Sequence, residues 1–145
     1  VEAFAKAGAD IITFHYEATN HPEELIEKIH ALGKRAGISV KPATPTFVLE
    51  PLVRKADLVL IMTVEPGFGG QKLLQPCVDK VHEVARMCKM FDAFPEIEVD
   101  GGVTPDNVGD LIKNGANVIV AGSAVFKAPD TEKAVCALKG DLSDL

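Results

Sequence analysis

The sequence predicts an α/β fold in which helices cover a parallel sheet. Three observations support this prediction: short apolar segments rich in β-branched residues recur along the chain, segments with helical spacing lie between them, and the helix-to-strand junctions repeat one pattern. Alternation of this kind is typical of either a doubly wound sheet or a (β/α)8 barrel.

Five apolar segments are expected to be strands. Each is bounded by Gly, Asp or Pro and is too short for the core of a helix. Because most of their apolar residues are consecutive, the segments suit parallel strands that are buried on both faces. They are Ile11–Phe14, Gly37–Val40, Leu58–Val64, Ile97–Val99 and Val118–Ala121.

Three helices are expected between these strands. The first begins at Asn20–Glu24, where an N-cap precedes acidic residues near the positive end of the helix dipole. The second covers Gln75–Met90 and carries apolar residues at helical spacing. The third begins at Thr104–Asn107, with Pro at its first helical position.

The junctions Ala7–Ile12 and Asn114–Ile119 share one pattern, and Lys55–Val59 is a weaker relative. A glycine that ends a helix in the left-handed conformation is commonly followed by a strand. No linker divides the chain, so residues 1–145 are expected to form one domain. A full barrel has eight strands in about 250 residues. If the fold is a barrel, we expect the missing strands to precede Val1.

The composition excludes several classes of function. The 145 residues carry a net charge of −6 with no basic cluster, which argues against binding nucleic acid. No apolar run reaches about 18 residues, so neither a membrane span nor a secretory signal is expected. The three cysteines lack C-x-x-C spacing and are interpreted as reduced intracellular thiols in the core, which predicts a cytoplasmic protein.

Glycine-rich segments follow three successive strands. They are Glu65–Gln71, Asp100–Gly102 and Gly122–Ser123, and the last is expected to begin a helix. Glycines allow backbone N–H groups to approach an anion, and helix N-termini favour negative charge. One glycine pair alone is more often a tight turn, but three converging loops indicate a phosphate pocket. No nucleoside-triphosphate P-loop motif is present.

Asp100 is the principal candidate for catalysis. It ends its strand before a glycine pair, where a carboxylate can act as general acid, general base or metal ligand. Its alternative role is that of a turn residue that bonds its own backbone. Strand parity places Glu98 and Asp100 on one face, opposite Ile97 and Val99.

His15, Glu17 and Lys41 are further candidates on neighbouring strands. His15 and Glu17 could be metal ligands at positions i and i+2, but a hydrogen-bonded network with Lys41 is the favoured interpretation because buried charges need partners. Met62 is interpreted as packing, or as an apolar floor beneath a ligand. Three other histidines are expected at the surface or in caps: His21, His30 and His82.

Three segments resemble the ribulose-phosphate 3-epimerase family, in motif and in order: Leu60–Gln71, Ile97–Val103 and Val120–Ala124. His15–Ala18 and Lys41–Pro45 are similar to segments of its eukaryotic cytosolic members. The resemblance covers essentially the whole chain and corresponds to strands four to eight of that family's barrel.

The resemblance implies a TIM barrel that interconverts D-ribulose 5-phosphate and D-xylulose 5-phosphate in the pentose phosphate pathway. It implies proton transfer at C3 by two aspartates around a divalent metal, zinc or iron, with manganese or cobalt as alternatives. It also implies a homodimer or higher homo-oligomer for the full-length protein. Asp100 matches a residue that is both catalytic and a metal ligand, and Met62 matches a substrate-lining residue. The phosphate-binding positions match Gly67, Phe68, Gly69, Gly70, Gly101, Gly102, Gly122 and Ser123.

The family's other catalytic Asp, its metal-binding histidines and a substrate-binding Ser have no counterpart here. We therefore expect this chain alone to be inactive or weakly active, with open sheet edges at Ile11–Phe14 and Val118–Ala121. Two alternatives remain: another phosphosugar-binding barrel enzyme and a non-catalytic phosphate-binding fragment. A doubly wound fold fits less well because it concentrates its anion loops at one switch point.

Overall fold

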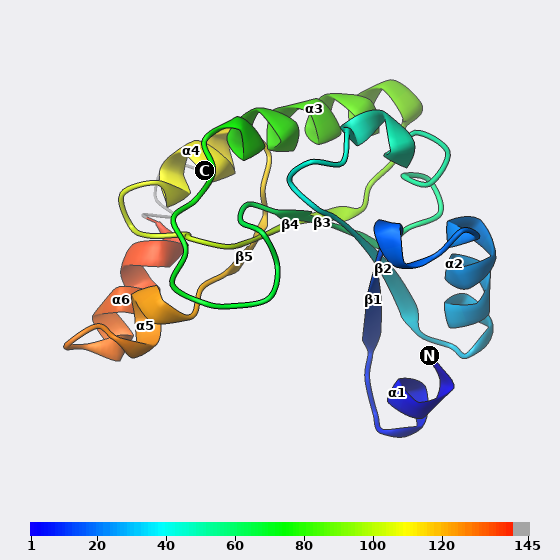
Figure 1. Ribbon diagram of the computed structural model, residues 1–145, viewed down its shortest axis with the longest axis horizontal. Coiled ribbons are helices and arrows are strands. Elements are labelled where there is room, and N and C mark those ends of the chain that lie inside the picture. Colours follow the sequence, from blue (N-terminus) through cyan, green and yellow to red (C-terminus); the bar gives the residue numbers. More distant parts are fainter. Residues whose placement is uncertain (141–145) are drawn as a thin grey trace.

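The computed structural model describes residues 1–140 and contains one five-stranded sheet. All neighbouring strands are parallel and lie in chain order, β1-β2-β3-β4-β5 (Figure 1). This confirms the predicted α/β fold with a parallel sheet. The strands are β1 (Ile11–His15), β2 (Arg35–Val40), β3 (Leu58–Met62), β4 (Glu96–Asp100) and β5 (Val118–Val120).

Two predicted strands are shorter than expected: β5 ends at Val120 and not at Ala121, and β3 loses two residues. The apolar run continues to Val64, but β3 ends at Met62. The chain turns at Thr63, whose N–H donates to the Asp100 carbonyl at 2.9 Å and whose hydroxyl donates to the Gly101 carbonyl. This turn directs the following glycine-rich loop towards the end of β4.

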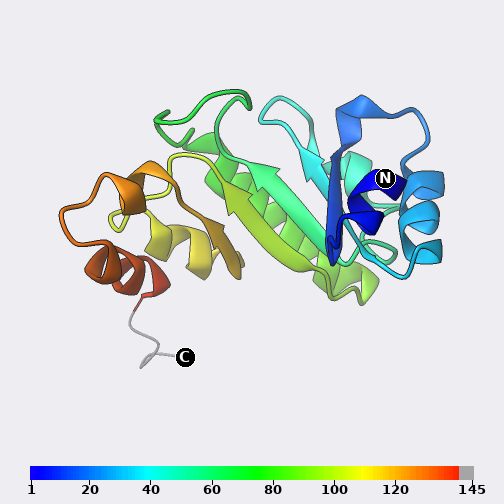
Figure 2. The same cartoon turned by 90° about the horizontal axis from the view of Figure 1, so that it is seen from below.

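Helices cover one face of the sheet, while the opposite face carries none from residues 1–140 (Figure 2). The short α1 and the helices α2, α3 and α4 alternate with the strands, and α5 and α6 follow β5. The helices are α1 (Glu2–Lys6), α2 (Pro22–Ala31), α3 (Pro76–Phe91), α4 (Val108–Lys113), α5 (Ser123–Phe126) and α6 (Thr131–Lys139), with 3-10 turns η1 (Tyr16–Ala18) and η2 (Thr46–Leu49).

One predicted helix start is wrong. α4 begins at Val108 because the Asn107 side chain accepts the Thr104 N–H at 2.8 Å and closes a turn ahead of the helix. α2 begins at Pro22, within the predicted segment Asn20–Glu24, and its N-cap is His21, whose side chain makes no capping bond. Instead, the His21 N–H donates to the Thr19 hydroxyl at 3.0 Å.

The hydrophobic core lies between the sheet and its helices. Along β4, buried Ile97 and Val99 face this core and alternate with the more exposed Glu98 and Asp100, as strand parity predicts. The predicted strand segments thus place apolar side chains against the helices on one face of the sheet. Their polar side chains lie on the opposite face, which the helices do not cover. The fully buried core residues include Ile26, Ile29, Ile38, Val40, Val59, Ile61, Val81, Val84 and Leu111.

Cys77 and Cys88 are buried as expected, but Cys136 is exposed, so its predicted place in the core is wrong. His30 and His82 are exposed and His21 lies at a helix start, in agreement with the prediction for these three residues. Across residues 1–140, no helix combines the length and apolar character needed to cross a membrane.

The repeated junctions share a hydrogen-bonding device that joins neighbouring strands. Asp57, directly before β3, donates its N–H to the Ala36 carbonyl at 2.8 Å, and its carboxylate accepts the Ala36 N–H at 2.7 Å. Asn117, directly before β5, makes the same pair of bonds with Ile97, at 2.9 and 2.8 Å. At these junctions a side-chain oxygen therefore accepts a backbone N–H of the neighbouring strand, directly before the regular backbone pairing of the two strands begins.

Replacing Asp57 by Asn is expected to weaken the pH dependence of stability in acid. Burial opposes ionisation, but bonds from the Ala36 N–H and from His30 at 2.7 Å outweigh it and lower the pKa of Asp57. Because the pKa is lower in the folded state, its stabilising effect is present above the ordinary value and is lost as the pH falls below it. Urea unfolding between about pH 5 and about pH 3 should give a shallower decline for the variant than for the wild type.

The matched control is Asp110→Asn. The exposed Asp110 side chain makes no hydrogen bond or ion pair within residues 1–140. Its substitution should leave the wild-type pH dependence intact, and equal slopes for Asp57→Asn and the wild type would contradict the assignment.

Candidate active site

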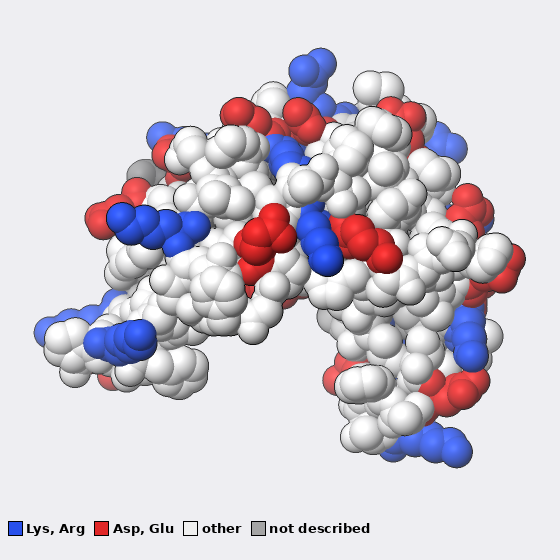
Figure 3. All heavy atoms as spheres, viewed as in Figure 1, with Lys and Arg blue, Asp and Glu red and all other residues white. Residues whose placement is uncertain are grey.

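A cavity of about 630 Å³ lies at the carboxyl ends of the strands, on the face without helices. The space-filling view shows this side of the molecule as a deep hollow (Figure 3). The position is where parallel α/β enzymes commonly bind their ligands. Its lining contains all ten site residues predicted from the sequence: Met62, Gly67, Phe68, Gly69, Gly70, Asp100, Gly101, Gly102, Gly122 and Ser123.

Asp100 is the last residue of β4 and lies beside Met62 across the β3–β4 pair. Its carboxylate accepts no hydrogen bond from residues 1–140, and burial raises its pKa. Glu98, two residues earlier on the same face, also has a raised pKa, first because of burial and then because of the negative charges of Asp100 and Glu96. The site thus has a carboxylate that faces the cavity and is unpaired within the described chain.

The loop after β3 is packed closely against the loop after β4. The Leu74 N–H donates to the Thr63 carbonyl at 2.8 Å, which returns the loop to the end of β3. Gly102 has a φ of +68°, and a Cβ atom there would lie 2.2 Å from the Leu73 nitrogen. Glycine is therefore required at Gly102 by both backbone conformation and space.

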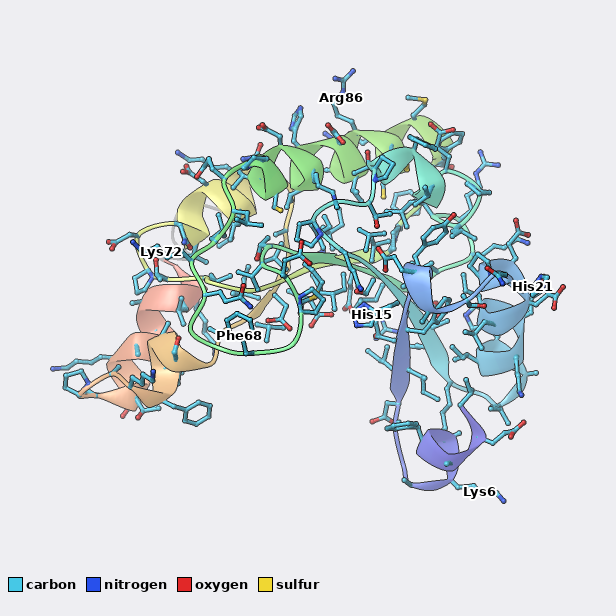
Figure 4. The ribbon with its side chains drawn as sticks, viewed as in Figure 1. Lys6, His15, His21, Phe68, Lys72 and Arg86 are labelled. Carbon is cyan, nitrogen blue, oxygen red and sulfur yellow. The ribbon has the colours of Figure 1, made fainter. Side chains whose placement is uncertain are left out.

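Gln71 supports the glycine-rich loop from inside. Its carboxamide donates to the carbonyls of Glu65 at 2.6 Å and Phe68 at 3.1 Å. Phe68 is 72% exposed, and Figure 4 shows it on this loop, beside the hollow. The bracing by Gln71 and Thr63 was not predicted, because a polar residue in a loop gives no sequence signal for the carbonyl it will bind.

The third loop begins a helix, as predicted. Gly122 is the N-cap of α5, and its carbonyl accepts the Phe126 N–H at 2.9 Å. The first N–H groups of any helix have no partner within that helix. The four-residue α5 therefore adds free donors to the glycine-rich loops around the cavity.

The expected hydrogen-bonded network of His15, Glu17 and Lys41 forms only in part: Glu17 bonds Lys41, but through the backbone of Lys41, and His15 bonds Ser39 instead. β1 ends at His15, whose ring lines the cavity and whose Nδ1 lies 2.9 Å from the hydroxyl of buried Ser39 (Figure 4). Glu17 lies beyond the strand, in η1, and accepts from the backbone N–H of Lys41 at 2.8 Å. A strand pattern extended through Glu17 could not anticipate this change of direction.

Comparison with solved structures shows the same fold in two other enzymes. A tryptophan synthase alpha-subunit mutant from Pyrococcus furiosus matches with a TM-score of 0.70 and 27% identity, over 96% of this chain and 59% of that one. A 3-hexulose-6-phosphate synthase from Salmonella typhimurium matches with a TM-score of 0.64 and 20% identity, over 94% and 63% of the two chains. At 20% identity, the second match shows the fold alone.

Comparison of sequences is more specific. Ribulose-phosphate 3-epimerase from Synechocystis is 45% identical over 96% of this chain and 61% of its own length. The Escherichia coli K12 protein of that name is 41% identical over 99% of this chain, and the chloroplastic protein of Arabidopsis thaliana is 45% identical over 96%. The chain spans 50% to 64% of the length of these three relatives. The model of the ribulose-phosphate 3 epimerase family matches residues 1–126, and the chain therefore belongs to this family.

Proposed function

We propose that this chain supplies the phosphate-binding loops and one acid/base carboxylate of a ribulose-phosphate 3-epimerase. The substrates would be D-ribulose 5-phosphate and D-xylulose 5-phosphate, as in the pentose phosphate pathway. The observation that carries the proposal is the convergence of Asp100, Met62 and three glycine-rich loops on one cavity. Family membership and relatives that are 41–45% identical support the same substrate class.

In this proposal, Asp100 exchanges a proton with C3 of the sugar. Its raised pKa favours this role, because acid/base groups work best when their pKa lies near the operating pH. Backbone N–H groups of the glycine-rich loops hold the phosphate and thereby fix the reacting carbon relative to the carboxylate. Inversion at C3 needs a proton donor on the opposite face, which we expect from another part of the protein.

A divalent metal, zinc or iron, with manganese or cobalt as alternatives, is part of the proposal. Asp100 is the expected ligand within residues 1–140, where no group of three or more His, Cys, Asp or Glu side chains could hold an ion. The described residues alone do not fit a complete metal site. The remaining ligands would come from elsewhere in the protein, and the proton transfer above is argued without the metal.

We also propose that residues 1–145 form one domain that is part of a (β/α)8 barrel, whose other strands adjoin β1 and β5. The consecutive strand order supports this, since a doubly wound sheet reverses its order at a switch point. Asp10 gives a second argument. Its carbonyl accepts the Arg35 N–H at 3.0 Å, just as the Asp57 carbonyl accepts the Glu96 N–H at 2.9 Å.

Asp10 differs from Asp57 in its N–H and carboxylate groups, which face the position of a preceding strand. Asp57 uses its N–H and carboxylate to bind Ala36 of the preceding strand. The same groups of exposed Asp10 have no partner within residues 1–140, and they lie at the free edge of β1. The repeated device therefore favours a parallel strand beside β1, with Asp10 paired to its first residues.

Replacing Asp10 by Ala tests this arrangement. In the 145-residue chain the substitution should change the free energy of unfolding by less than about 0.5 kcal/mol, whereas Asn117→Ala should cost about 1 kcal/mol. In a native-length protein with a strand beside β1, the two substitutions should cost about the same. Chemical unfolding of both lengths makes the comparison, and a negligible cost for Asp10→Ala at native length would argue against the paired strand.

The activity itself is tested by two measurements on two lengths of protein. The 145-residue chain should bind inorganic phosphate but show little or no exchange of the C3 proton with deuterated solvent. The native-length protein, identified by its intact mass relative to 15.5 kDa, should show both. Phosphate binding without exchange at native length would favour a non-catalytic phosphosugar-binding protein. A cytoplasmic location and a homo-oligomer remain predictions for the same material.

A further inference from the structure

Lys80 lies outside the predicted site, yet it joins the loop after β2 to α3, the helix that follows the glycine-rich loop. It belongs to α3, and among residues 1–140 its ammonium group donates only to backbone carbonyls of the loop after β2. The distances from Nζ are 2.9 Å to the Lys41 oxygen, 3.1 Å to the Pro42 oxygen and 2.7 Å to the Thr44 oxygen. The ammonium group of Lys80 thus binds the carbonyls of three of the four residues in the loop 41–44.

The surroundings of Lys80 make this a costly arrangement. Burial lowers the pKa of its ammonium group, and Lys80 forms no ion pair within residues 1–140. Lys80 is half-buried, and although the negative charges of Glu17 and Glu83 favour its ammonium form, a partly buried charge outside an ion pair depends on its hydrogen bonds. A methionine would fill similar space without that cost, so packing alone does not explain a lysine here.

Glu17 holds the same loop from the opposite side. Its carboxylate accepts the Lys41 N–H at 2.8 Å and the Thr44 hydroxyl. Burial opposes its ionisation, but these two bonds outweigh burial and lower the pKa of Glu17. The loop 41–44 is therefore fixed between an anion from the loop after β1 and a cation from α3.

The helix that carries Lys80 also fixes one end of the glycine-rich loop. α3 begins at Pro76, and the Cys77 N–H donates to the Leu74 carbonyl at 2.9 Å, directly after that loop. A second contact joins α3 to η2, which follows the loop 41–44, since the Thr46 hydroxyl donates to Glu83 at 2.6 Å. In Figure 1, the loop between β2 and η2 runs beneath α3.

We infer that Lys80 is a positioning residue of the phosphosugar site, and that Glu17 assists it. By fastening the loop after β2 to α3, Lys80 keeps the glycine-rich loop in the shape that binds phosphate. The inference rests on the proposed function, because it assigns Lys80 a role in phosphate binding without contact to the phosphate.

The test compares Lys80→Met with the matched control Lys89→Met in the 145-residue chain. Lys89 is on the same helix, is exposed, and its side chain makes no hydrogen bond or ion pair within residues 1–140. Inorganic phosphate is titrated while the amide resonances of Gly67 and Gly70 are followed by NMR. Distant positioning residues change coupled binding by roughly two- to thirtyfold. We expect weakening in that range for Lys80→Met and none for Lys89→Met.

Amide hydrogen exchange at Lys41 and Thr44 separates the possible outcomes. Faster exchange together with weaker phosphate binding supports the positioning role. Faster exchange with unchanged phosphate affinity overturns it and leaves Lys80 a purely structural contact. If the wild-type chain binds no phosphate, the proposed phosphate site fails, and the positioning role fails with it, whatever the exchange rates.

A second variant keeps the test decisive if Lys80→Met does not fold. Glu17→Ala releases the same loop from its exposed side without emptying a buried site. It should also weaken phosphate binding, by a smaller factor than Lys80→Met, because α3 stays attached through Lys80. A folded Glu17→Ala variant with faster exchange at Lys41 and wild-type phosphate affinity would overturn the inference.

Discussion

Replacing Asp100 by Asn in the native-length protein is expected to slow C3 proton exchange by about a hundredfold or more, since general acid/base groups contribute on that scale. Asn has nearly the same shape but neither accepts nor returns the proton. Phosphate affinity should change little, because the phosphate is assigned to backbone N–H groups of loops that the substitution does not alter. Deuterium incorporation at C3 and phosphate titration measure the two effects separately.

The control for Asp100→Asn is Asp106→Asn. Asp106 follows the same strand but is exposed, and its side chain makes no hydrogen bond or ion pair within residues 1–140. Its substitution should leave both exchange and phosphate affinity at wild-type levels. Wild-type exchange by Asp100→Asn would remove the proton-transfer role, whereas loss of phosphate affinity alone would indicate that Asp100 shapes the loops instead.

The strands were predictable from their apolar runs, and a second, independent signal agrees at β1 and β5. Apolar runs mark their interiors, and glycines such as Gly8 and Gly115, with φ of +103° and +120°, precede β1 and β5 by a fixed distance. The parallel arrangement then brings all strand ends to one edge of the sheet. For that reason, the residues assigned to the site from three separate segments line one cavity.

Other features could not be predicted because they depend on contacts between residues far apart in the chain. Lys80 has the sequence context of any lysine on an amphipathic helix, and its three carbonyl partners lie 36 to 39 residues away. The early end of β3 depends on Thr63 bonding Gly101, 38 residues later. Helix starts also shift when a side chain such as Asn107 closes a turn first.

Replacing Gly102 by Ala is expected to destabilise the chain by about 2 to 4 kcal/mol and to abolish measurable phosphate binding. The backbone conformation at φ +68° disfavours any residue with a Cβ atom. That atom would also lie 2.2 Å from the Leu73 nitrogen and 2.8 Å from the Gln71 oxygen, so the loop after β3 would have to move away from the end of β4. Urea unfolding and phosphate titration measure the two losses.

Gly109→Ala is the matched control because its expected effect on stability is opposite to that of Gly102→Ala. Gly109 lies in α4 and has no positive φ, and an added Cβ would meet no atom of residues 1–140 within 4 Å apart from its chain neighbours and its own helix backbone. Ala in a helix interior is more stable than Gly by roughly 0.5 to 1 kcal/mol, so this variant should gain stability and bind phosphate normally. If Gly102→Ala keeps wild-type phosphate affinity despite its lower stability, the close approach of the two loops is not needed for binding. The proposed phosphate site would then depend on the other glycine-rich loops alone.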